Sequence, residues 1–126
     1  MKKLFSLIYI PLAWTIFIQV LLCVPGSALP SAESFDLPNL DKIIHVIFFG
    51  TLVVLWCFYL SRKVSNRRSL AILFFFVFLA ASINGIAIEY IQLYFVPFRT
   101  FDQADITADI LSAAIGYGIC NVKLLT

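Results

Sequence analysis

The chain has 126 residues, of which 62% are hydrophobic, 16% aromatic and only 13% charged, and its net charge is +2. Soluble globular domains are about 45–50% apolar and about 25% charged, and a core of this size cannot hide so much apolar surface from water. The composition therefore excludes a soluble enzyme, a disordered linker and a collagen-like chain, and it predicts a membrane protein.

Four apolar segments predict four transmembrane helices, because about 20 helical residues cross a bilayer core about 30 Å thick. The third segment is longer than a crossing needs, and the fourth is less apolar, with acids in its first turns. Loops with prolines or polar residues separate the segments. The sequence thus predicts one all-α polytopic membrane domain over residues 1–126, with helices at about 4–24, 43–60, 70–96 and 104–122.

The first apolar segment also resembles a secretory signal peptide. Lys2 and Lys3 precede it, and small residues follow near Gly26. Its apolar stretch of about 21 residues is longer than the usual h-region of about 7–15 residues, which favours a retained helix. Cleavage stays open as the alternative, and the orientation of the remaining helices is the same in both cases.

The distribution of charge predicts the orientation. With a cytoplasmic N-terminus, seven of the nine Lys and Arg residues lie on the cytoplasmic side, and all seven acids lie on the opposite side. Basic residues of short loops collect on the cytoplasmic side of a membrane, so both chain ends are expected there. The basic stretch over residues 61–69 then marks topology and contacts lipid head groups, and nucleic acid is not an expected partner.

Polar side chains collect where the last three predicted helices begin or end on the outer side. An ionisable group at membrane depth costs about 2.5–3.5 kcal/mol on insertion scales, so such groups mark candidate functional sites. Because short loops make successive helices neighbours, we expect one shared polar pocket that opens outward. Its expected residues are Asp41, Lys42, His45, Glu89, Gln92, Arg99, Asp102, Asp105 and Asp109.

Simpler roles are open for some of these residues. Asp102 is suited to cap the start of the fourth helix, and Lys42 to extend its ammonium to the lipid head groups. Glu89 and His45 are suited to join helices by hydrogen bonds within the membrane. Asp109 lies too deep in its helix for a capping role, which favours a place in the pocket.

The cysteines predict neither a disulfide nor a zinc site, and the sequence alone assigns no residue to a metal. The three cysteines lie in apolar runs without the spacing of a metal site, which indicates small apolar groups in helix contacts. His45, Glu89 and Asp105 are a conceivable nitrogen and oxygen ligand set, but they stand on different predicted helices, so their geometry stays open.

The polar residues form an ordered set. Asp-Lys-x-x-His over residues 41–45 opens one span, and Glu-x-x-Gln over residues 89–92 closes the next; Arg99, Phe-Asp-x-x-Asp over residues 101–105, a polar residue at 109 and Gly116 follow. Over about residues 38–118 the set resembles the VanZ-like family of small bacterial integral membrane proteins. The resemblance implies a bacterial cytoplasmic-membrane protein of about four helices.

What the family implies about function is limited. Its founding member is associated with low-level resistance to the glycopeptide antibiotic teicoplanin. The family usually has Asn where this chain has Asp109, and often Gly where it has Ser112. The additional carboxylate is expected to make the pocket more acidic.

Three functions remain open at this stage. In the first, the pocket binds a membrane lipid head group, a lipid-linked cell-wall intermediate or a glycopeptide-type antibiotic, with Arg99 and Lys42 holding phosphate or carboxylate. In the second, the chain is a membrane-embedded enzyme acting on a lipid or phosphorylated substrate. His45 would be a general base near Asp41, and carboxylates would bind a divalent cation that polarises a phosphoryl oxygen. In the third, the polar network fixes helix packing in a structural or partner protein. The residues name no cofactor and no oligomeric state.

Overall fold

A computed structural model describes the chain over residues 3, 7–23, 40–96 and 103–125, and the structural statements below refer to these residues. They form helices and contain no β-strand. The helices are α2 (Tyr9–Leu22), α3 (Leu40–Lys63), α4 (Arg67–Phe95) and α5 (Gln103–Leu124). The predicted all-α fold is confirmed, and α3, α4 and α5 begin and end within about three residues of the predicted helices.

The first helix is shorter than the sequence predicts. α2 has 14 residues, and Leu7 and Ile8 before it form a bend and a turn. Pro11 lies in its first turn, where the missing backbone N–H is not needed for an internal hydrogen bond. At the same end of the bundle, α3 and α4 are joined through Asn66, whose side chain accepts a hydrogen bond from the Ser69 backbone N–H at 3.1 Å and so caps α4.

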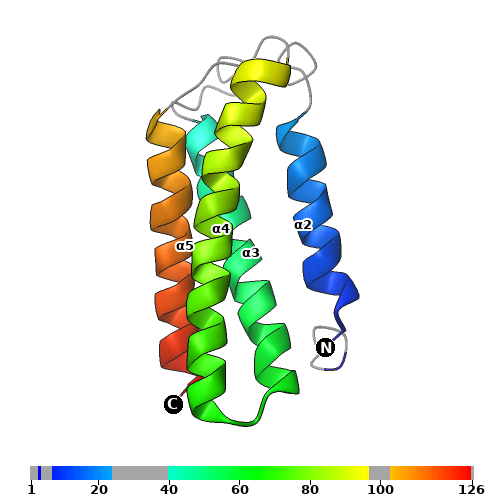
Figure 1. The fold of residues 1–126 in the computed structure, drawn as a ribbon, viewed down its shortest axis with the longest axis vertical. Coiled ribbons are helices and arrows are strands. Elements are labelled where there is room, and N and C mark those ends of the chain that lie inside the picture. Colours follow the sequence, from blue (N-terminus) through cyan, green and yellow to red (C-terminus); the bar gives the residue numbers. More distant parts are fainter. Residues whose placement is uncertain (1–2, 4–6, 24–39, 97–102, 126) are drawn as a thin grey trace.

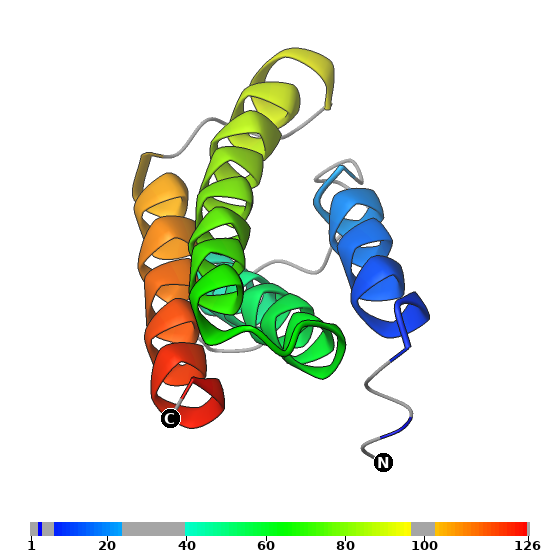
Figure 2. The same ribbon diagram turned by 60° about the horizontal axis from the view of Figure 1, so that its bottom comes forward.

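The helices run alternately in opposite directions along one bundle (Figure 1). α5 packs most extensively against α3 and then against α4, and α2 lies beside α3 at the edge of this group. The start of α2, the end of α5 and the α3–α4 connection lie at one end of the bundle, as Figures 1 and 2 show. The opposite end holds the last residue of α2, the first turns of α3 and α5, and the last turns of α4. We call it the polar end.

The core is apolar, and so is most of the outer surface. Phe49 and Val53 of α3 and Phe74 and Ile88 of α4 are fully buried. Large apolar side chains are also exposed along the outer faces of all four helices, for example Ile83 at 65%. Soluble monomers rarely expose such continuous apolar surface.

Two helices are long and apolar enough to cross a membrane. They are the stretch Lys42–Lys63 of α3 and all of α4, Arg67–Phe95. α2 is apolar but shorter, and α5 carries acids on its buried face. Four crossings therefore stay a prediction, whereas four helices are a structural fact for the described residues.

Candidate functional site

The centre of the polar end is a short hydrogen bond between α3 and α5. His45 Nδ1 lies 2.7 Å from Asp109 Oδ1, and both side chains are buried. When Asp109 is ionised its oxygen can only accept, so Nδ1 of His45 donates, and in a neutral imidazole the lone pair is then on Nε2, which faces the other way. The ring of Phe49, one turn further along α3, stacks on the imidazole with centroids 6.2 Å apart.

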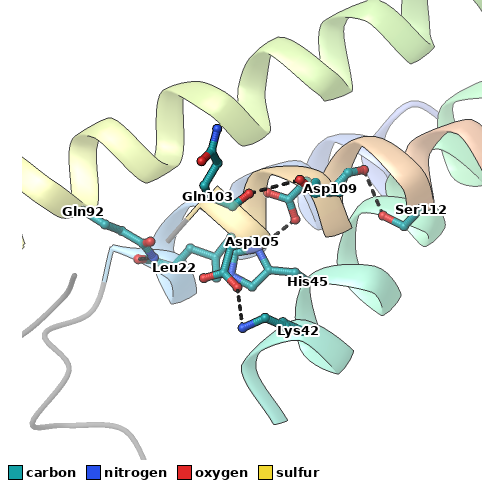
Figure 3. Close-up of polar contacts among 9 residues, drawn as sticks. Leu22, Lys42, His45, Gln92, Gln103, Asp105, Asp109 and Ser112 are labelled. Atoms are coloured by element: carbon teal, nitrogen blue, oxygen red, sulfur yellow. Dashed lines mark hydrogen bonds and ion pairs between the residues drawn. The ribbon is translucent and has the colours of Figure 1, made fainter. Parts of the chain in front are cut away.

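A second aspartate lies on the other side of the imidazole. Asp105 stands one turn before Asp109 on α5, and its Oδ2 is 3.9 Å from His45 Nε2. Its Oδ1 is 3.7 Å from Nζ of Lys42, whose side chain is 34% exposed. Figure 3 shows Lys42 and His45 reaching from α3 toward the two aspartates of α5. Lys42 thus connects the buried groups with the surface of the polar end.

α4 adds a third carboxylate. Glu89 is fully buried, and one donor atom each from His45, Glu89 and Asp105 lie within 4.8 Å of one another. Three helices therefore bring their ionisable groups to one place. We call the set of Lys42, His45, Glu89, Asp105 and Asp109 the acid–histidine cluster.

Glycine at position 85 makes room for this arrangement. Gly85 lies one turn before Glu89 on α4, and a Cβ there would lie 2.8 Å from both Cβ and Oδ2 of Asp109. Atoms this close must move apart, and Cβ of Asp109 is not the flexible end of a side chain. The close approach of α4 and α5 at the cluster therefore depends on the missing side chain.

We expect Gly85→Ala to push α5 away from α4 and to destabilise the protein by about 1–3 kcal/mol, the usual cost of overpacking. Gly118→Ala is the matched control, because a Cβ at Gly118 of α5 meets nothing within 4 Å. Unfolding free energies in one detergent measure both variants. Equal stability of the two would contradict the close packing at Gly85.

Not all predicted residues join the cluster. Gln92 is buried, and its Nε2 donates to the backbone oxygen of Leu22 at 2.7 Å, so its amide ties α4 to the end of α2 (Figure 3). Arg99 and Asp102 lie outside the described residues. Asp41 belongs to α3, but its side chain is also outside the described part, so the expected pairing of Asp41 with His45 stays a prediction.

The cluster is more enclosed than we expected. His45, Glu89, Asp105 and Asp109 are each at most 7% exposed, and of the five members Lys42 is the most exposed. An outward opening of the pocket stays a prediction, and Lys42 is the member that reaches the surface. Ser112 does not solvate the carboxylate of Asp109, because its hydroxyl donates to the Asp109 backbone oxygen at 2.9 Å.

Sequence reasoning did not anticipate how α2 is attached. Gln19 Nε2 donates to Asn84 Oδ1 at 2.7 Å, and Trp56 Nε1 donates to Thr15 Oγ1 at 2.9 Å. A glutamine in the middle of an apolar run was the available signal, since a polar group in a membrane helix usually finds a partner on another helix. These bonds position α2 and leave the acid–histidine cluster to the other three helices.

The cluster has three chemical capabilities. Its carboxylates can bind a cation or accept hydrogen bonds, its oriented imidazole can take up a proton, and its bonds can fix three helices relative to one another. In the described residues it contains three acids against one lysine and one histidine, so its electrostatic character is acidic.

Comparison with known proteins agrees with the ordered set of polar residues. The family model VanZ/LLP1 matches residues 3–124. An uncharacterized protein of the fission yeast Schizosaccharomyces pombe is 35% identical over 100 residues, which are 78% of this chain and 57% of the relative, so the chain spans little more than half the length of that relative. No solved structure matches. The family match covers nearly the whole chain, including every residue of the acid–histidine cluster, and the chain therefore belongs to the VanZ/LLP1 family.

Proposed function

We propose that this chain is a multi-pass membrane protein that crosses the bilayer with all four helices. The apolar outer faces and the two helices of sufficient length support this topology. The basic residues near the chain ends and the α3–α4 connection support a cytoplasmic position for that end of the bundle. In a bacterium this places the protein in the cytoplasmic membrane, with the polar end at the outer surface.

The proposed function is to bind the polar head group of a membrane amphiphile at the polar end. The single observation that carries it is the burial of three acids and a histidine, with Lys42 at the edge, at one end of an otherwise apolar bundle. Buried charges are costly in a membrane and are kept where they bind something. Lys42 offers an ammonium group to a phosphate, and the carboxylates offer acceptors to hydroxyl or amine donors.

Among possible amphiphiles, the comparisons favour a lipid that occurs in many organisms over a ligand that is specific to bacteria. Candidates from the resemblance are a lipid-linked cell-wall intermediate and a glycopeptide-type antibiotic. A relative in fission yeast favours a head group that occurs in bacterial and eukaryotic membranes alike. A phospholipid meets this condition, and we take it as the first ligand to test.

Native mass spectrometry of the full chain, extracted from vesicles of phosphatidylethanolamine and phosphatidylglycerol, tests this function. We expect one lipid to remain bound to the natural protein and at least about a tenfold smaller bound fraction in Lys42→Gln and Glu89→Gln, since a charged hydrogen bond contributes about 1.5–3 kcal/mol. Thr107→Val is the control, because Thr107 is exposed on α5 and bonds only locally, to the Gln103 backbone oxygen. Equal lipid retention in all four proteins would refute head-group binding at the cluster.

Two other functions have specific support. The Asp109–His45 bond resembles the orientation of a general base, which favours a membrane-embedded enzyme acting on a lipid or phosphorylated substrate. The contribution of three helices to one buried cluster favours a structural or partner protein with a polar helix-locking network. Turnover of an envelope lipid would support the first, and a large stability loss in Glu89→Gln without any bound ligand would support the second.

A further inference from the structure

The spacing of three donor atoms in the cluster fits a metal ion. One atom each from His45, Glu89 and Asp105 lie within 4.8 Å of one another, and all three residues are buried. An ion bound at about 2.0–2.2 Å holds neighbouring ligand atoms roughly 3–4 Å apart. Small rotations of the carboxylate side chains therefore suffice to close the set around an ion.

The contacts of the two ring nitrogens of His45 are a second observation. Its Nδ1 is engaged at 2.7 Å by Asp109, whereas its Nε2 lies 3.9 Å from Asp105 Oδ2. The longer distance exceeds that of a hydrogen bond but equals the separation of two ligands on one ion. A histidine that donates one ring N–H to a carboxylate and presents the other nitrogen to a metal is the usual arrangement in metalloproteins.

Charge points in the same direction. The described part of the cluster brings together Glu89, Asp105 and Asp109, three groups that can each carry a negative charge. Like charges held close together in a low-dielectric site repel one another strongly. A divalent cation among the carboxylates would offset this repulsion, whereas a neutral ligand would leave it in place.

We propose that His45, Glu89 and Asp105 bind a divalent metal ion, with Asp109 as a positioning residue that orients His45. One imidazole and two carboxylates suit Mn²⁺ or Zn²⁺ better than the all-oxygen preference of Ca²⁺ or Mg²⁺. The inference deepens the proposed function and rests on it in one respect: the ion and Lys42 together would contact the phosphate of the head group. Binding of the ion itself needs no lipid.

The test is a Mn²⁺ titration of the full chain in detergent, after treatment with EDTA and its removal, followed by electron paramagnetic resonance. We expect one ion per chain, and nitrogen couplings in the bound spectrum that report the imidazole. Asp105→Asn and Glu89→Gln should weaken binding at least tenfold, and His45→Gln should also abolish the nitrogen couplings. Thr107→Val, with its exposed side chain on α5, should bind as the natural protein does.

Asp109 variants separate positioning from ligation. Loss of a hydrogen-bonding partner behind a ligating histidine usually costs about 10–100-fold in metal affinity, which we expect for Asp109→Leu. Asp109→Asn keeps an oxygen that accepts from Nδ1, so its loss should be smaller and its nitrogen couplings should persist. Gel filtration of each variant verifies folding, and Asp105→Asn and Glu89→Gln, which keep side-chain size, carry the test if Asp109→Leu does not fold.

The outcomes distinguish the metal from the lipid. The metal site would be overturned if the folded natural protein bound neither Mn²⁺ nor Zn²⁺. It would also be overturned if Asp105→Asn and Glu89→Gln bound Mn²⁺ as tightly as the natural protein does. If lipid is retained in EDTA while no ion binds, the proposed function stands and the metal site falls. If the ion binds and no lipid is retained with or without it, the metal site stands and the proposed function falls.

Discussion

Asp109→Leu is expected to destabilise the folded protein by about 3 kcal/mol, the upper end of the cost of leaving a buried hydrogen-bond donor without its acceptor. The substitution leaves Nδ1 of His45 without its acceptor in a site that is closed to water. It also places an apolar side chain against Gly85, where the carboxylate now lies. Unfolding by denaturant in a single detergent measures the change in the free energy of unfolding.

Asp109→Asn is the matched control for this prediction. The amide is nearly the same size, and its oxygen still accepts from Nδ1 of His45, so we expect a change of no more than about 1 kcal/mol, the net value of a typical hydrogen bond. If both variants lost the same stability, the carboxylate itself and not the hydrogen bond would hold α3 and α5 together.

Phe49→Ala is expected to have an effect of similar size. Phe49 is fully buried in the core and stacks on the His45 ring. Truncating a buried phenylalanine costs about 3–5 kcal/mol in soluble proteins, through lost transfer energy and the cavity that remains. In a lipid environment the cavity part persists, because it arises from lost contacts between packed atoms. The cavity would also free the imidazole to turn, so Mn²⁺ affinity should fall together with stability.

The control is Phe76→Ala on α4. The Phe76 side chain is 58% exposed and faces outward, where lipid would fill the space that its ring leaves. We therefore expect the free energy of unfolding and Mn²⁺ binding to stay close to those of the natural protein. A loss of stability as large as that of Phe49→Ala would show that the outer face of α4 is buried against another chain.

The end of the bundle at which the polar residues lie could be predicted from the sequence, whereas their pairing could not. Hydropathy gives the approximate extent of each helix, and alternating direction then puts His45, Glu89 and Asp105 at the same end of the bundle. Rotation of each helix about its own axis decides which groups touch, and that rotation is set by packing. The close contact at Gly85, invisible in one sequence, is what brings Asp109 against α4.

Two further features of the structure differ from what the sequence suggests, each for its own reason. Gln92 shares the depth of the cluster, but its amide bonds to Leu22 of α2, because its direction on α4 differs from that of Glu89. The start of α2 at Tyr9 was also beyond reach, since apolar residues continue on its N-terminal side and give no signal for the bend at Leu7. Hydropathy measures which residues favour lipid, and it says little about where a helix begins within them.

The alternating direction of the helices has a consequence for selectivity. α3 and α5 both begin at the polar end, and the aligned peptide dipoles of each contribute roughly half a positive charge there. The negative ends of α2 and α4 lie at the same end of the bundle. That of α4 lies six residues beyond Glu89, about 9 Å further along the axis, and at that of α2 the Leu22 backbone oxygen accepts a hydrogen bond from Gln92. This backbone charge cannot be removed by changing side chains. If two carboxylates of the acid–histidine cluster are neutralised, Lys42 and the two helix starts dominate the local potential. Such a variant should therefore attract anions rather than cations.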